Sequence, residues 1–118
     1  MTVWVDTLIN VRGGSPAWRW PTACHLFSDD LDELHRFAAQ IGLKRSWFQG
    51  GDVPHYDLNA RKRRRAVEAG AVPLMVGPRL KQAFAAARKA AREHNAEVRD
   101  SRARARVCLP YLPQKEKL

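Results

Sequence analysis

The stretch that decides the fold runs from Cys24 to Val76 and opens with CHLFSDDLDELHRFAAQIGL, residues 24–43. Residues 22–28 alternate their side chains between two faces, which is typical of a β-strand. Asp30 suits the N-cap of a helix, and the apolar residues after it recur at helical spacing. Gly42 supplies the left-handed position at which such a helix ends. This part of the chain therefore predicts a strand followed by a helix.

The second half of the stretch predicts a shorter helix and a shorter strand. Asn59 can cap a helix over residues 60–69. The apolar run 71–76 predicts a strand, and Pro73, which lacks an N–H, either begins it or places it at a sheet edge. Residues 53–58 are too short and too polar a run to predict a strand by themselves.

On the N-terminal side, a strand and a long loop precede this stretch. Residues 2–6 are β-branched and aromatic and predict a strand that Asp6 ends. Residues 7–21 contain glycine, proline and asparagine, which are typical of turns, and therefore predict a loop. Loops of this length are often functional. Residues 18–20 of that loop read Trp-Arg-Trp. Aromatic side chains interleaved with arginine can stack on bases, or the tryptophans can fix the loop to a small core.

On the C-terminal side the chain is basic and helical. Pro78 suits the first turn of a helix that runs to about Val98 and carries a narrow apolar stripe. Residues 101–107 alternate arginine with alanine or valine, which predicts either a basic strand or an arm that becomes ordered on a partner. The remaining residues predict a frayed tail.

Together these elements predict an α/β fold in one small domain, since 118 residues leave no room for a second core. We expect three or four strands packed by two or three helices, with a long basic C-terminal helix. The domain would span residues 1–98, and residues 99–118 would form a basic C-terminal arm.

The charge balance points to an anionic partner. The chain has 21 Lys and Arg against 12 Asp and Glu, a formal net charge of +9, and a pI near 10.4. Such a domain attracts polyanions and phosphates. Nucleic acid, a nucleotide, an acidic protein face and an anionic membrane surface all fit, as does solvated charge without a specific partner.

The cysteines and the apolar runs exclude several protein classes. Cys24 and Cys108 lie far apart and form no CxxC or CxxH pattern, which argues against a structural zinc site and a disulfide framework. Cys24 beside His25 is either an activated thiol or, as we expect, a buried small apolar residue. No apolar run approaches the roughly 20 residues that span a membrane, and the N-terminus does not read as a signal peptide. We therefore expect a cytoplasmic protein in a reducing compartment, without a membrane partner.

A series of short motifs resembles the family called domain of unknown function 4031, which is met in phages, prophages and some actinobacterial proteins. The resemblance covers about residues 1–76 and implies an α/β domain and a phage setting, but no established reaction. It is carried by Thr2-Val3-Trp4-Val5-Asp6, Cys24-His25-Leu26, Leu31-Asp32-Glu33-Leu34-His35, Ile41-Gly42-Leu43, Trp47-Phe48-Gln49, His55-Tyr56-Asp57-Leu58 and Ala66-Val67-Glu68-Ala69-Gly70-Ala71-Val72.

Histidines and aspartates at predicted strand ends and helix starts form the first candidate site. They could converge in one crevice and hold a metal, or a histidine could act as an acid or base. Their plainer roles are helix caps, turns and hydrogen-bonded strand positions. Because no HExxH, Gly-rich phosphate loop or nucleophile elbow is present, we expect a ligand pocket without metal or cofactor. We expect it to be lined by Asp6, His25, His55, Tyr56 and Asp57.

Clustered arginines form the second candidate site. The run over residues 61–65 lies near the start of a predicted helix, where positive charge opposes the macrodipole. Contact with phosphate is one reason to carry such a cluster, and a solvated basic face is the other. The residues we expect to bind phosphate are Arg61, Arg63, Arg64, Arg65, Arg102, Arg104 and Arg106.

These observations favour a non-enzymatic, phage-type accessory protein that binds nucleic acid or a nucleotide through its basic helix, with interference in a host defence as one specific form. A small metal-dependent hydrolase or nuclease that uses the His/Asp cluster is the first alternative. An inhibitor that binds an acidic host protein surface is the second. A phage-encoded protein would act in the host cytoplasm. Formation of a homo-oligomer is a further alternative.

Overall fold

The central strand of the sheet is β3, the longest one in the described part of the chain. The computed structural model describes residues 2–11 and 18–108, with side chains through residue 101. Its elements are β1 (Val3–Val5), β2 (Ile9–Asn10), β3 (Thr22–Ser28), α1 (Leu31–Gln40), a 3-10 turn (Arg45–Trp47), β4 (Phe48–Gln49), β5 (His55–Leu58), α2 (Ala60–Glu68), β6 (Val72–Pro73) and α3 (Pro78–Cys108).

The sheet is mixed, with the strand order β4-β5-β3-β1-β6, and β2 pairs with β3 off this path. β3 runs antiparallel to β1 and to β5, whereas β1 and β6 are parallel. The predicted α/β class is confirmed, but the sheet has six strands rather than three or four. Two of the strands that periodicity did not predict, β2 and β4, have two residues each, too few to leave a periodic pattern in a sequence.

Helices α1 and α2 cover one face of the sheet. The carboxylate of Asp30 accepts a hydrogen bond from the Glu33 N–H at 2.9 Å and caps α1. The Asn59 side chain accepts from the Lys62 N–H at 2.8 Å and caps α2, so both predicted caps are confirmed. The buried side chains between these helices and the sheet include Val5, Cys24, Leu26, Leu34, Tyr56 and Leu58.

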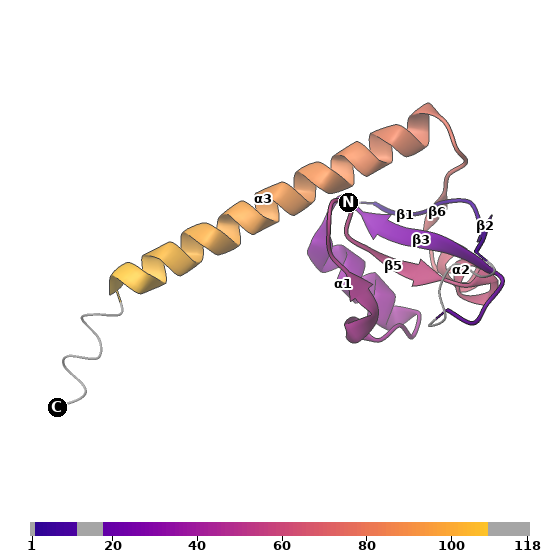
Figure 1. Cartoon of the computed structure of the whole chain (residues 1–118), viewed down its shortest axis with the longest axis horizontal. Coiled ribbons are helices and arrows are strands. Elements are labelled where there is room, and N and C mark those ends of the chain that lie inside the picture. Colours follow the sequence, from indigo (N-terminus) through magenta and orange to yellow (C-terminus); the bar gives the residue numbers. More distant parts are fainter. Residues whose placement is uncertain (1, 12–17, 109–118) are drawn as a thin grey trace.

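Helix α3 covers the opposite face, so the domain has three layers (Figure 1). Its apolar stripe packs Leu80, Ala83 and Ala87 against Phe27 of β3 and Leu74, with Phe84 beside them. Pleating sends alternate residues of β3 to opposite faces. Phe27 and His25 therefore lie on the face that α3 covers.

The last helix extends further than predicted. α3 continues to Cys108, so residues 101–107, predicted as a basic strand or an arm, are helical. Alanine and arginine both favour a helix. This helix propensity outweighs the tendency of a weakly alternating pattern to form a strand. The buried side chains of α3 end at Ala91, and its C-terminal half projects beyond the sheet (Figure 1). Residues 109–118 of the predicted arm lie outside the described residues.

The predicted loop over residues 7–21 contains the short strand β2, which pairs with the start of β3. Beyond this pairing, the Val11 N–H donates to the Pro21 carbonyl at 3.0 Å. No helix in the described residues is long and apolar enough to span a membrane.

Candidate metal centre

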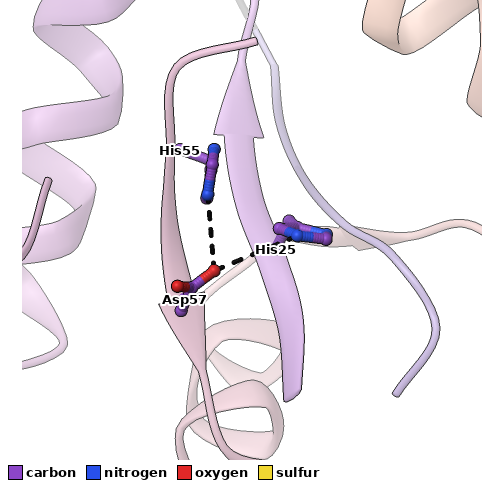
Figure 2. Close-up of side chains that lie close together, drawn as sticks. All are labelled: His25, His55 and Asp57. Carbon is purple, nitrogen blue, oxygen red and sulfur yellow. Dashed lines mark ion pairs between the residues drawn. The ribbon is translucent and has the colours of Figure 1, made fainter. Parts of the chain in front are cut away.

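Strands β3 and β5 bring two histidines and one aspartate together on the face that α3 covers. Their antiparallel register pairs His25 directly with Asp57. His55 precedes Asp57 by two residues, so both side chains of β5 point to the same face. One nitrogen of each histidine and one oxygen of Asp57 all lie within 4.8 Å of one another. Figure 2 shows both imidazoles beside the Asp57 carboxylate.

His25 is oriented by the buried carboxylate of Asp6, at the end of β1. The two oxygens of Asp6 accept from the backbone N–H of His25 at 2.6 Å and from its ring Nδ1 at 2.7 Å. A carboxylate that accepts from Nδ1 leaves the lone pair of the neutral ring on Nε2. That Nε2 lies 3.9 Å from Oδ1 of Asp57. Asp6 therefore selects the tautomer in which His25 can be a ligand through Nε2.

His55 is oriented in the same sense by the backbone. Its Nδ1 lies 2.8 Å from the carbonyl oxygen of Val53, which can only accept, so Nδ1 carries the proton. Its Nε2 faces Oδ1 of Asp57 at 3.4 Å. The contact with Asp57 raises the pKa of His55, and the contact with His55 lowers the pKa of Asp57. Without a metal, the two groups thus favour an imidazolium–carboxylate pair.

The spacing of these three atoms suits a first-row divalent cation. Ligands bound to Zn²⁺ at 2.0–2.2 Å in tetrahedral positions lie about 3.4 Å apart. The two Nε2-to-Oδ1 distances are 3.4 and 3.9 Å, and all three ligand atoms lie within 4.8 Å of one another. A closure of at most about 1.4 Å would therefore bring every pair to the tetrahedral spacing. Two imidazoles and one carboxylate leave at least one coordination position open, as in catalytic rather than structural sites.

These three residues could hold a metal ion, although the sequence led us to expect none. That expectation rested on the lack of a short recognised motif. Here the donors come from two strands that are distant in sequence, so only the register joins them.

A cavity of about 350 Å³ opens between the sheet and α3 beside the two imidazoles. Arg88 of α3 lines this cavity and pairs with Asp52 at 2.6 Å. The Asp52 side chain is 72% exposed, and ion pairs of this kind contribute about 0–1 kcal/mol. An anion in the cavity could therefore recruit Arg88 at little cost.

Tyr56, predicted to line the same pocket, lies on the opposite face of the sheet. It is 1% exposed, and its hydroxyl lies 2.8 Å from Nδ1 of His35 on α1. Burial raises the pKa of Tyr56 and lowers the pKa of His35, so near neutral pH the hydroxyl donates to a neutral ring. The structure thus brings together four of the five predicted pocket residues and leaves Tyr56 apart from them.

Among the predicted arginines whose side chains the structure describes, those of α2 differ in exposure. Arg63 is half-buried, and its Nε donates to the Asp6 carbonyl oxygen at 2.9 Å, which ties α2 to the end of β1. The exposed members on α2 are Arg61, Arg64 and Arg65. Residues 102, 104 and 106 lie on the projecting part of α3, and their side chains are outside the described set.

Gln49, Asp52 and Arg88 surround the site without having been predicted to do so. The amide of Gln49 on β4 donates to Oδ2 of Asp57 and so orients this carboxylate. This contact depends on the pairing of β4 with β5, which places Gln49 opposite His55. No local pattern could show it, since β4 has only two residues.

Comparison with known proteins assigns the family but no activity. The model of the family described as Protein of unknown function (DUF4031) matches residues 3–89. The match extends past residue 76, where the resemblance seen in the motifs ends, into the part of α3 that packs on the sheet. The searches of curated proteins and of solved structures gave no significant match. This span of the chain includes His25, His55 and Asp57. The match shows that the protein belongs to the DUF4031 family.

Proposed function

We propose that the protein is a small metal-dependent hydrolase of phosphate esters, with His25, His55 and Asp57 as ligands of one divalent cation. The observation that carries this proposal is the shared orientation of the two imidazoles. Each donates Nδ1–H to an oxygen and presents Nε2 to the same oxygen of Asp57. Oxygen acceptors behind metal-binding histidines are the arrangement that fixes ring orientation in known metal sites.

A cation in this set would polarise a phosphoryl oxygen and lower the pKa of a bound water toward neutrality. The surrounding residues would orient the reactants. Asp6 and Gln49 hold the ligand side chains from behind, and Arg88 reaches the cavity with a positive charge. The net charge of +9 favours an anionic substrate, which supports a phosphate ester.

Metal binding and turnover test this proposal together. We expect the purified protein to bind one Zn²⁺ or Mn²⁺ per chain in a calorimetric titration and to hydrolyse a chromogenic phosphodiester only when metal is supplied. H55Q and D57N should lose both properties. H94Q is the matched control, because His94 is an exposed residue of α3 outside the set.

Two results would overturn the proposal. One is a wild-type protein that binds neither metal above background. The other is an H55Q variant that binds metal and turns over substrate as the wild type does.

The exposed arginines of α2 support a second candidate function, which is non-enzymatic binding of nucleic acid. A hollow of about 660 Å³ beside them is lined by Trp20, Thr22 and Asn59 together with Arg61 and Arg65. The same basic surface is compatible with the phage-type form in which the protein sequesters a nucleotide signal, and with the separate alternative of an inhibitor that binds an acidic host protein surface.

Salt dependence tests the nucleic-acid form. The affinity should fall steeply with salt, and R64E should reduce the slope. Arg63 is unsuitable for this test because it holds the carbonyl of Asp6. An unchanged salt profile in R64E would remove this candidate.

A further inference from the structure

A cleft lined by three tryptophans adjoins the candidate metal centre. It encloses about 500 Å³, within the range of pockets that hold small molecules. Its aromatic walls come from the loop before β3 and from the 3-10 turn before β4. The lining residues that matter here are Trp18, Arg19, Trp20, Trp47, Asp57 and Lys62.

Two of the tryptophans are exposed where burial would be the expected state for so large a side chain. Trp20 is 42% and Trp47 is 48% exposed. Trp18 supports Trp20: its ring centroid lies 4.8 Å from that of Trp20, and its Nε1 donates to the Thr22 carbonyl at 3.1 Å. Exposed aromatic faces on an anchored base form a surface on which a planar ligand can stack.

Cations lie over these same rings. The guanidinium of Arg19 is 5.7 Å from the Trp20 ring centroid, and Nζ of Lys44 is 5.7 Å from that of Trp47. Lys62 also lines the cleft. A ligand with both a π-face and a negative charge would satisfy both features, and a nucleotide has this chemistry.

The cleft meets the candidate metal centre at one side chain. Asp57 lines the cleft while its Oδ1 faces both histidines. Gln49 also lines the cleft and donates to the other oxygen of Asp57. A ligand that fills the cleft therefore lies beside Asp57, whereas His25 and His55 line the cavity between the sheet and α3.

We propose that this cleft binds the base of a nucleotide and directs its phosphate to the cation held by His25, His55 and Asp57. The position of the phosphate rests on the proposed function, whereas base binding in the cleft does not. The base can belong to a free nucleotide or to the end of a single strand. The shared chemistry is a nucleobase joined to a phosphate.

Tryptophan fluorescence tests base binding directly. We expect adenosine monophosphate to quench the fluorescence of the wild-type protein in a saturable way, and ribose 5-phosphate, which lacks the base, to leave it unchanged. W47A should weaken nucleotide binding at least tenfold and keep the metal stoichiometry. M75A is the matched control, since Met75 is an exposed apolar residue that does not line the cleft. W20A provides an independent variant on the other wall.

The outcomes separate the two proposals. If the wild-type protein binds no metal and H55Q still binds the nucleotide, the cleft proposal is supported and the hydrolase proposal is overturned. Metal binding and turnover without saturable quenching by a nucleotide, or equal affinities of the wild type, W47A and W20A, overturn the cleft. A short oligonucleotide with a terminal phosphate serves as the second ligand. Tighter binding of it than of the monophosphate assigns the base to a strand end, and equal or weaker binding assigns it to a free nucleotide.

Discussion

Replacing Asp6 with asparagine should convert His25 from the Nδ1–H tautomer to the Nε2–H tautomer. The size of the side chain at residue 6 stays the same. In the wild type both Asp6 oxygens accept, from the backbone N–H and from Nδ1 of His25. In D6N one oxygen can still accept from the backbone, but the amide nitrogen must then face the ring and donate to Nδ1. The ring proton would move to Nε2, the atom proposed to bind the cation.

The size of the effect follows from this geometry. Loss of an oxygen acceptor behind a metal-binding histidine typically costs about 10- to 100-fold in metal affinity. Asp6 is 8% exposed and its contact with Nδ1 is short, at 2.7 Å, so we expect D6N to reach the upper part of that range. Because the backbone contact survives, the domain should still fold.

Two measurements check this prediction. Competition with a chromophoric chelator gives the Zn²⁺ affinity, and the ring ¹⁵N shifts of His25 report the tautomer in the metal-free protein. D32N is the control, since Asp32 is an exposed residue of α1. Equal Zn²⁺ affinities of D6N and the wild type, or an Nε2–H tautomer in the wild type, would refute the reasoning.

Further predictions concern the thiol, a helix cap and the pH dependence. Burial, followed by the charge of Asp6, raises the pKa of Cys24 to about 12, so in a C108S background the thiol should react with a disulfide reagent at about pH 8 only after denaturation. Rapid reaction of the native protein would contradict this. N59A should lower the free energy of unfolding by about 0.5–2 kcal/mol in urea, because the Lys62 N–H loses its acceptor; an unchanged midpoint would disagree. The folded-state pKa of His55 is raised above its ordinary value of 6.5, so its contribution to stability is complete below about pH 6.5 and is lost as the pH rises through the folded-state pKa. The stability difference between metal-free wild type and H55Q should therefore shrink from mildly acidic to alkaline pH, and a difference that grows would show the opposite shift.

The strand and helix over residues 22–41 were predictable because their signals are local. Asp30 caps its own helix through a residue three positions later, and β3 is long enough for its alternation to be visible. β5 was missed because His55 and Asp57 made a short run look polar. Its buried positions, Tyr56 and Leu58, face the other side of the sheet.

The site could be predicted as a set of residues but not as an arrangement. Asp6, His25, His55 and Asp57 were chosen for their residue types, whereas the approach of His25 to Asp57 depends on the register between β3 and β5. Which way an imidazole is turned depends on the carboxylate of Asp6, which follows β1, or on a nearby carbonyl. Sequence patterns do not contain such tertiary information.

Helix α3 has two parts with different dependence on the rest of the domain. Residues 78–91 are held by side chains buried against the sheet, so their amide protons should exchange at a rate set by unfolding of the whole domain. Residues 92–108 extend the same hydrogen-bonded rod by about 25 Å. There the backbone hydrogen bonds depend on helix propensity, and exchange should accelerate toward the tip. One residue inserted in this outer part would turn everything beyond it by about 100° around the axis without disturbing the core.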